Sequence, residues 1–137
     1  CGLLLSAATL ARDAAPAAVP AHRFFHVQLG GAETQPVSGR LLLFAIDAKD
    51  AEAAAKEHGG DGKVEEVDTS PFFPTQTAVA AREVGRLVPG QTIDIDTDRI
   101  AFPQGWSQLP PGDYYVQAVL DVHHDYNYFG RDAGDLL

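Results

Sequence analysis

The clearest pattern in the chain is a strict alternation of apolar and polar positions close to its C-terminal end. Apolar side chains occupy every second position there, at Tyr114, Val116, Ala118, Leu120 and Val122. A turn sequence, LPPG, ends one residue before them. Because successive side chains of a strand point to opposite faces, the pattern predicts a half-buried β-strand. We expect its even-numbered side chains to lie against a second layer of strands.

Four more segments have the composition of strands, at residues 24–29, 38–47, 77–88 and 92–96. The second is almost continuously apolar, which predicts a strand covered on both faces. The third fits a helix or a strand, and we favour a strand because a Pro-Gly-Gln turn follows it. We also predict a short strand over residues 64–67, and no regular element around the two prolines at 71 and 74.

Residues 48–58 differ from the rest, because Ala, Lys and Glu dominate and a Gly-Gly pair follows. This composition predicts a short surface helix. Short strands, Gly/Pro turns and one helix together predict an all-β fold, an antiparallel β-sandwich with one short surface helix.

The first residues have the composition of an export signal. Residues 1–11 are apolar and small, and small-x-small sites follow at Ala17 and Ala21. We interpret residues 1–21 as the remnant of a secretory signal peptide and residues 22–137 as the sandwich domain. An N-terminal helix and a lipoprotein acylated at Cys1 remain alternatives. The ending DLL resembles the start of a further strand, so we expect the domain to be truncated before its last strand.

Length and charge narrow the function classes. A chain of 137 residues allows one ordinary domain. Ten basic against nineteen acidic residues give a net charge of −9, which disfavours nucleic-acid backbones. One cysteine excludes an internal disulfide and a Cys-based zinc site. No apolar run reaches the length of a membrane span.

The best candidate site for a ligand or metal follows the alternating strand. If the strand continues, Asp121, His123 and Asp125 share one face, where two carboxylates and an imidazole can bind a divalent metal or share protons. Asp125, Asn127 and Asp132 supply oxygen ligands suited to calcium, although an EF-hand match fails. The alternative is a solvated strand end with polar turn residues. We therefore predict no cofactor other than calcium or zinc at this loop.

Other candidate chemistry is weaker. Ser107 stands in a sequence similar to a nucleophile elbow, but Leu109 replaces the required glycine and no helix follows. Asp94, Asp96 and Asp98 alternate with apolar residues and predict a solvated acidic face. Aromatic residues crowd the C-terminal third and can stack on sugars or serve as core anchors, namely Trp106, Tyr114, Tyr115, Tyr126, Tyr128 and Phe129.

Three segments together carry a resemblance to a known family. They are residues 109–135 (LPPGDYYVQAVLDVHHDYNYFGRDAGD), SGRLLLF at 38–44, and PGQT with the following ID pair at 89–96. They resemble the N-terminal β-domain of secreted bacterial esterases, which carry an enterochelin-esterase-like α/β-hydrolase domain downstream. A similar turn and strand occur in prealbumin-like and carboxypeptidase-regulatory-like sandwiches, so the resemblance implies an Ig-like or prealbumin-like β-sandwich.

The resemblance implies an accessory role, because the hydrolase part and its catalytic residues are not in this chain. We expect a non-catalytic sandwich of an exported esterase, periplasmic or secreted, that contributes to domain docking or substrate access. Its expected partner is then the downstream catalytic domain. We expect neither nucleic-acid binding nor a membrane span, and homo-oligomerisation remains open. The alternative is a stand-alone periplasmic binding module for a carbohydrate or a divalent metal.

Overall fold

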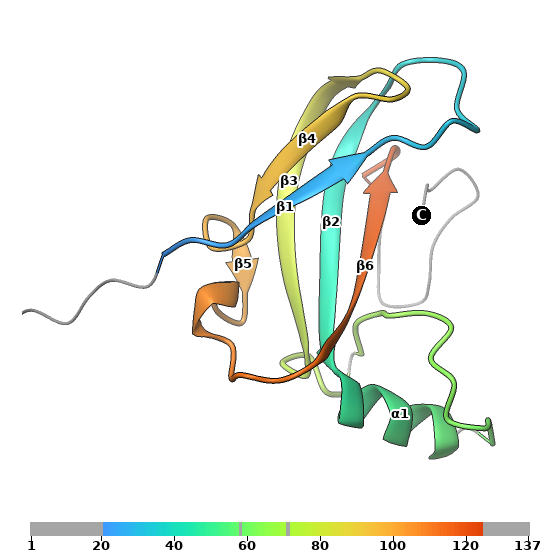
Figure 1. Cartoon of the computed structure of the whole chain (residues 1–137), viewed down its shortest axis with the longest axis vertical. Coiled ribbons are helices and arrows are strands. Elements are labelled where there is room, and N and C mark those ends of the chain that lie inside the picture. Colours follow the sequence, from blue (N-terminus) through green and yellow to red (C-terminus); the bar gives the residue numbers. More distant parts are fainter. Residues whose placement is uncertain (1–20, 58, 71, 125–137) are drawn as a thin grey trace, which may run out of the picture.

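The computed structural model describes residues 21–57, 59–70 and 72–124 (Figure 1). In chain order its elements are β1 (Phe24–Gln28), β2 (Val37–Asp47), α1 (Ala48–Glu57), β3 (Thr77–Leu87), β4 (Thr92–Asp96), β5 (Ala101–Phe102), the 3-10 helix η1 (Trp106–Gln108) and β6 (Tyr114–Asp121). The helix and the strands expected around residues 24–29, 38–47, 77–88, 92–96 and 114–122 are therefore confirmed.

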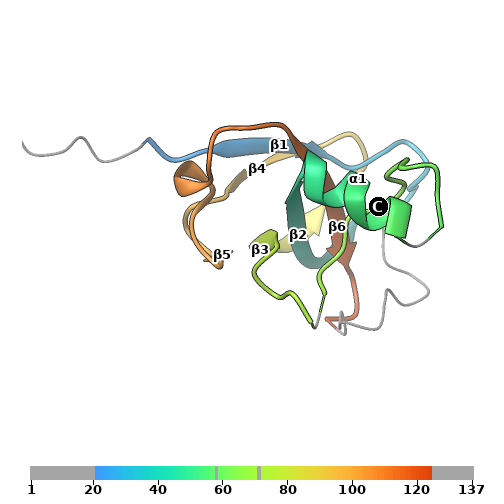
Figure 2. The same ribbon diagram turned by 90° about the horizontal axis from the view of Figure 1, so that it is seen from below.

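The strands form two antiparallel sheets. One has the order β5-β3-β2-β6, and the other contains β1 and β4. β2 lies in the interior of the larger sheet and pairs along its length with β3 and with β6. Figure 2 shows β1 and β4 in a separate layer from β2, β3 and β6. This confirms an all-β, sandwich-like fold with one short helix.

The main core lies between the two layers. The larger sheet contributes Leu41 and Leu43, and β4 contributes Ile95, all of them buried. The even-numbered side chains of β6 pack against this core as expected, with the exception of Val116, which is 43% exposed. The apolar positions of the alternating pattern are therefore the side chains by which β6 packs against the core.

A smaller apolar cluster covers the opposite face of the larger sheet. Leu42, Phe44 and Val119 are buried there beneath Val67, which belongs to the segment after α1. The predicted strand over residues 64–67 is wrong, because this segment forms no strand. The Val67 N–H donates to the side-chain oxygen of Gln117 at 2.6 Å, so a side chain replaces the backbone partner that a strand would supply.

The loops between the sheets have their own anchors. Trp106 of η1 is 2% exposed and meets the Phe25 ring edge to face, with centroids 5.1 Å apart. Thr97 is fully buried, and its hydroxyl and N–H both donate to the Arg23 carbonyl. These contacts fasten the start of β1 to the end of β4. Within the described ranges, α1 and η1 are too short to span a membrane.

Candidate functional site

The predicted metal residues are only partly within the described ranges. β6 ends at Asp121, which is 2% exposed, while residues 122–124 form a bend and His123 is exposed. The alternation that would place His123 beside Asp121 therefore stops at Asp121. Asp125, Asn127 and Asp132 lie outside the described residues. The described part of the chain holds no cluster of three or more His, Cys, Asp or Glu side chains suited to a metal, and the calcium or zinc site stays a prediction.

The other histidine of this bend has a defined partner. His124 Nε2 lies 3.0 Å from Glu83 Oε2, and Arg40 Nε donates to Glu83 Oε1 at 2.6 Å. Hydrogen bonds from His124 and from Arg40 lower the pKa of Glu83 below its usual value. This exposed triad connects the residues after β6 to β3 and β2.

Ser107 has a structural role. Its backbone N–H donates to Asp98 Oδ1 at 2.8 Å, and its hydroxyl also bonds to that carboxylate. The Arg23 N–H donates to Asp98 Oδ2 at 2.7 Å. Burial raises the pKa of Asp98, but these hydrogen bonds outweigh burial and bring the pKa below its usual value. Ser107 therefore anchors η1 to the residues that follow β4.

The acidic row on β4 is paired with histidines of the β1 segment. His22 Nδ1 lies 2.8 Å from Asp96, and His26 Nδ1 lies 2.5 Å from Asp94. The Asp98 N–H, followed by His22, lowers the pKa of Asp96, and Asp96 in turn raises the pKa of His22. Asp94 is exposed, as expected for a solvated acidic face, but the face is also paired with histidines, because register places His26 directly opposite Asp94.

A cavity of about 550 Å³ opens at the end of the sandwich where β2 leads into α1. Its floor includes Ala45 and Ala78, which are buried and directly opposite each other in the β2–β3 register. The methyl groups of two facing alanines leave a hollow at this end of the inner face. The apolar wall opposite consists of Pro103, Leu109 and Pro110 from the loops around η1.

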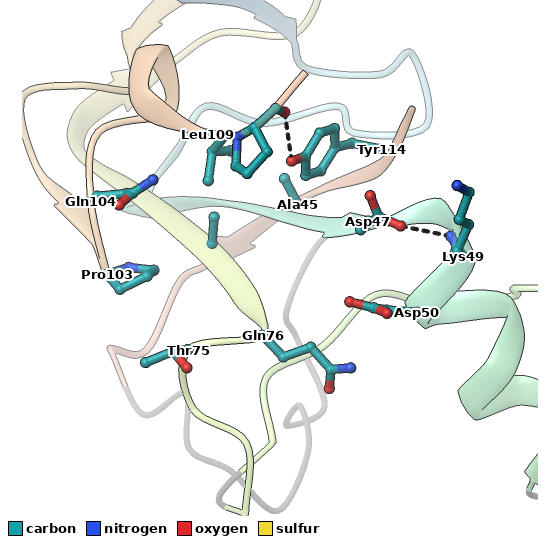
Figure 3. Close-up of a pocket in the computed structure, with 12 residues that line it drawn as sticks. Ala45, Asp47, Lys49, Asp50, Thr75, Gln76, Pro103, Gln104, Leu109 and Tyr114 are labelled. Carbon is teal, nitrogen blue, oxygen red and sulfur yellow. Dashed lines mark hydrogen bonds between the residues drawn. The ribbon is translucent and has the colours of Figure 1, made fainter. Parts of the chain in front are cut away.

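Polar side chains from four segments surround this cavity (Figure 3). They are Asp47, Lys49, Asp50, Thr75, Gln76 and Gln104. Asp47 is held as the N-cap of α1, because its Oδ1 accepts the Lys49 N–H at 2.9 Å. The Tyr114 hydroxyl donates to the Pro110 carbonyl at 2.9 Å, a tyrosine-corner contact that holds the turn before β6.

Sequence reasoning did not find this cavity. Among its polar residues, Asp47 alone had a role that the sequence could predict, because Asp is a common N-cap and stands directly before the predicted helix. Gln76 and Gln104 meet at the rim only because β3 and β5 pair, which no local pattern encodes. Among the aromatic candidates, Tyr114 lines the cavity, whereas Trp106 is buried and unable to stack on a sugar.

Comparison with known proteins adds no relative. No family model, curated protein or solved structure matches the chain.

Proposed function

We propose that the chain is a non-catalytic accessory β-sandwich of an exported esterase-type hydrolase, docked against the catalytic domain through apolar side chains. The exposure of two neighbouring phenylalanines carries the proposal. Phe72 is 84% exposed and Phe73 is 66% exposed. Large apolar side chains that remain together in water are typical of an interaction surface.

A second exposed apolar group comes from the edge of the larger sheet. Ile100 and Phe102, at β5, are also more than half exposed. The residues directly after Phe102 line the same cavity as Thr75, which follows Phe73 by only two positions. The loop before β3 and the edge strand β5 therefore bring exposed aromatic side chains to the surroundings of one cavity, and we infer that they form a single docking face.

The class of the partner is inferred from the resemblance to the N-terminal domain of secreted esterases. A sandwich whose docking face borders a cavity is suited to shape the entrance of a neighbouring active site. The signal-like composition of residues 1–21 supports a periplasmic or secreted location. The net charge of −9 favours a protein or small-molecule partner over a nucleic acid.

The reading frame around the 137 residues tests the class of partner. We expect a Gly-x-Ser-x-Gly motif and a later histidine within roughly 250 residues after this segment. A reading frame without them overturns the hydrolase assignment.

Binding measurements test the docking face. The isolated catalytic domain should bind this chain, and the double change of Phe72 and Phe73 to Ser should weaken the Kd by at least about tenfold. Phe24→Ser is the matched control, because Phe24 is 57% exposed but lies on β1. Equal losses in the double variant and the control would refute the assigned face.

A further inference from the structure

The cavity at the α1 end of the sandwich has available hydrogen-bonding groups on its rim. The side chains of Asp50, Thr75 and Gln76 form no hydrogen bond or ion pair with other protein groups in the described part of the chain. Asp47 is fixed by its capping bond, and the Gln104 amide is fixed by donating to the Gln108 carbonyl at 2.8 Å. The rim therefore combines oriented groups with groups free to bind a ligand.

The rim favours a ligand that donates hydrogen bonds. The carboxylates of Asp47 and Asp50 are hydrogen-bond acceptors, while the side chains of Thr75 and Gln76 can donate or accept. The carboxylates repel anions such as phosphate. Lys49 also lines the cavity, and its positive charge offsets part of the negative charge there, which weakens the attraction for a cation.

The walls favour a ligand that also has apolar patches. Leu109, Pro103 and the side of the Tyr114 ring line the cavity, and Ala45 and Ala78 form its floor. The Tyr114 hydroxyl is directed to Pro110, so the ring presents carbon atoms beside it. A sugar ring has hydroxyls at its edge and C–H groups on its face, and aromatic and apolar side chains can stack against that face.

We propose that this cavity binds a neutral saccharide of one or two sugar units. Its hydroxyls donate to Asp47 and Asp50 and exchange hydrogen bonds with Gln76, and its C–H face rests on Tyr114 and Leu109. A volume of about 550 Å³ lies within the usual range of small-ligand sites. The site belongs to this chain alone and does not require the partner domain.

Amide chemical-shift titration of the 137-residue chain tests the proposal with glucose, xylose, maltose and cellobiose as probes. At about 50 mM, which nearly saturates a site of millimolar Kd, at least one saccharide should shift amides of residues 47–50 and 75–76. Spermidine and phosphate are the cationic and anionic comparisons, and neither should produce this pattern. No saturable shift with any saccharide, or the same shifts with spermidine alone, overturns the proposal.

Substitutions separate the cavity from general effects of charge. Asp50→Ala and Gln76→Ala should each weaken the saccharide Kd by about tenfold, because each removes a direct hydrogen-bonding group. Both side chains are exposed, so the fold should persist. Glu57→Ala is the matched control, since it removes an exposed acid at the other end of α1. Unchanged affinity in both cavity variants, or an equal loss in the control, refutes the site.

Discussion

Asp98 connects three segments of the chain, and its replacement gives the sharpest test of the packing described above. The carboxylate accepts the N–H groups of Arg23 and Ser107 and the Ser107 hydroxyl. It therefore holds the residues before β1, the end of β4 and η1 together. Asp98→Ala leaves two backbone N–H groups without this partner, and water can replace it only in part.

The expected loss of unfolding free energy follows from the fact that the hydrogen bonds are made to a charged carboxylate. A hydrogen bond to a charged group contributes about 1.5–3 kcal/mol. Because the site is only partly buried, we expect Asp98→Ala to lower the free energy of unfolding by about 2 kcal/mol in total. That corresponds to a fall in Tm of roughly 6–10 °C for a domain of this size. Asp94→Ala is the control, with an expected loss below about 0.5 kcal/mol, because its carboxylate is exposed and bonds His26.

The structure also predicts how the stabilisation by Asp98 changes with pH. The pKa of Asp98 is lower in the folded state than its ordinary value of 3.8. The carboxylate therefore stabilises the fold above pH 3.8, and this contribution is lost as the pH falls through the folded value. Denaturant unfolding of wild type and Asp98→Ala should differ most near neutral pH and converge in acid. A variant as stable as the Asp94→Ala control, or a difference that grows in acid, would refute this reasoning.

Two further predictions concern β2 and the His–Asp row. Gly39→Ala should cost about 1–3 kcal/mol of unfolding free energy, because an added Cβ would overlap the Asp121 carbonyl oxygen. Gly85→Ala meets open space, so denaturant unfolding should show little change, and equal losses would contradict the close approach. The pKa of His22 should exceed 6.5 in an NMR titration and return toward it in Asp96→Asn; an unchanged value would disprove the pairing. The contribution of this pair to stability is complete between pH 3.8 and 6.5; it is lost as the pH rises above the folded pKa of His22 and as the pH falls through the lowered pKa of Asp96.

The strands were predictable because the pattern of apolar and polar residues along each strand matches the burial of its two faces. β2 is apolar on both faces and lies in the interior of the larger sheet, with apolar clusters on both sides. β6 alternates because only its even-numbered side chains face the second layer. Where side-chain period and burial agree in this way, local pattern is sufficient evidence for a strand.

The errors occurred where long-range contacts decide the local structure. Residues 64–67 contain apolar side chains that pack on the sheet, as Val67 does, but their backbone bonds a side chain instead of a strand. Apolar composition cannot distinguish a segment that pairs as a strand from one that packs on a sheet without strand pairing. The acidic row of β4 was recognised as one face of a strand, but its pairing with His22 and His26 depends on a register between segments about seventy residues apart.

The cavity and the exposed phenylalanines have a common physical origin. β3 and β4 are consecutive along the chain, yet they belong to different sheets, and within the described residues the second layer consists of β1 and β4. A two-stranded layer lies across the end of the larger sheet remote from α1 (Figure 1) and leaves the other end to loops. Ala45 and Ala78 belong to the buried core, and the cavity opens beside them where loops instead of a strand complete this end. Phe73 and Phe102 stand within a few residues of that cavity, which is why a docked partner and a bound saccharide would share one end of the molecule.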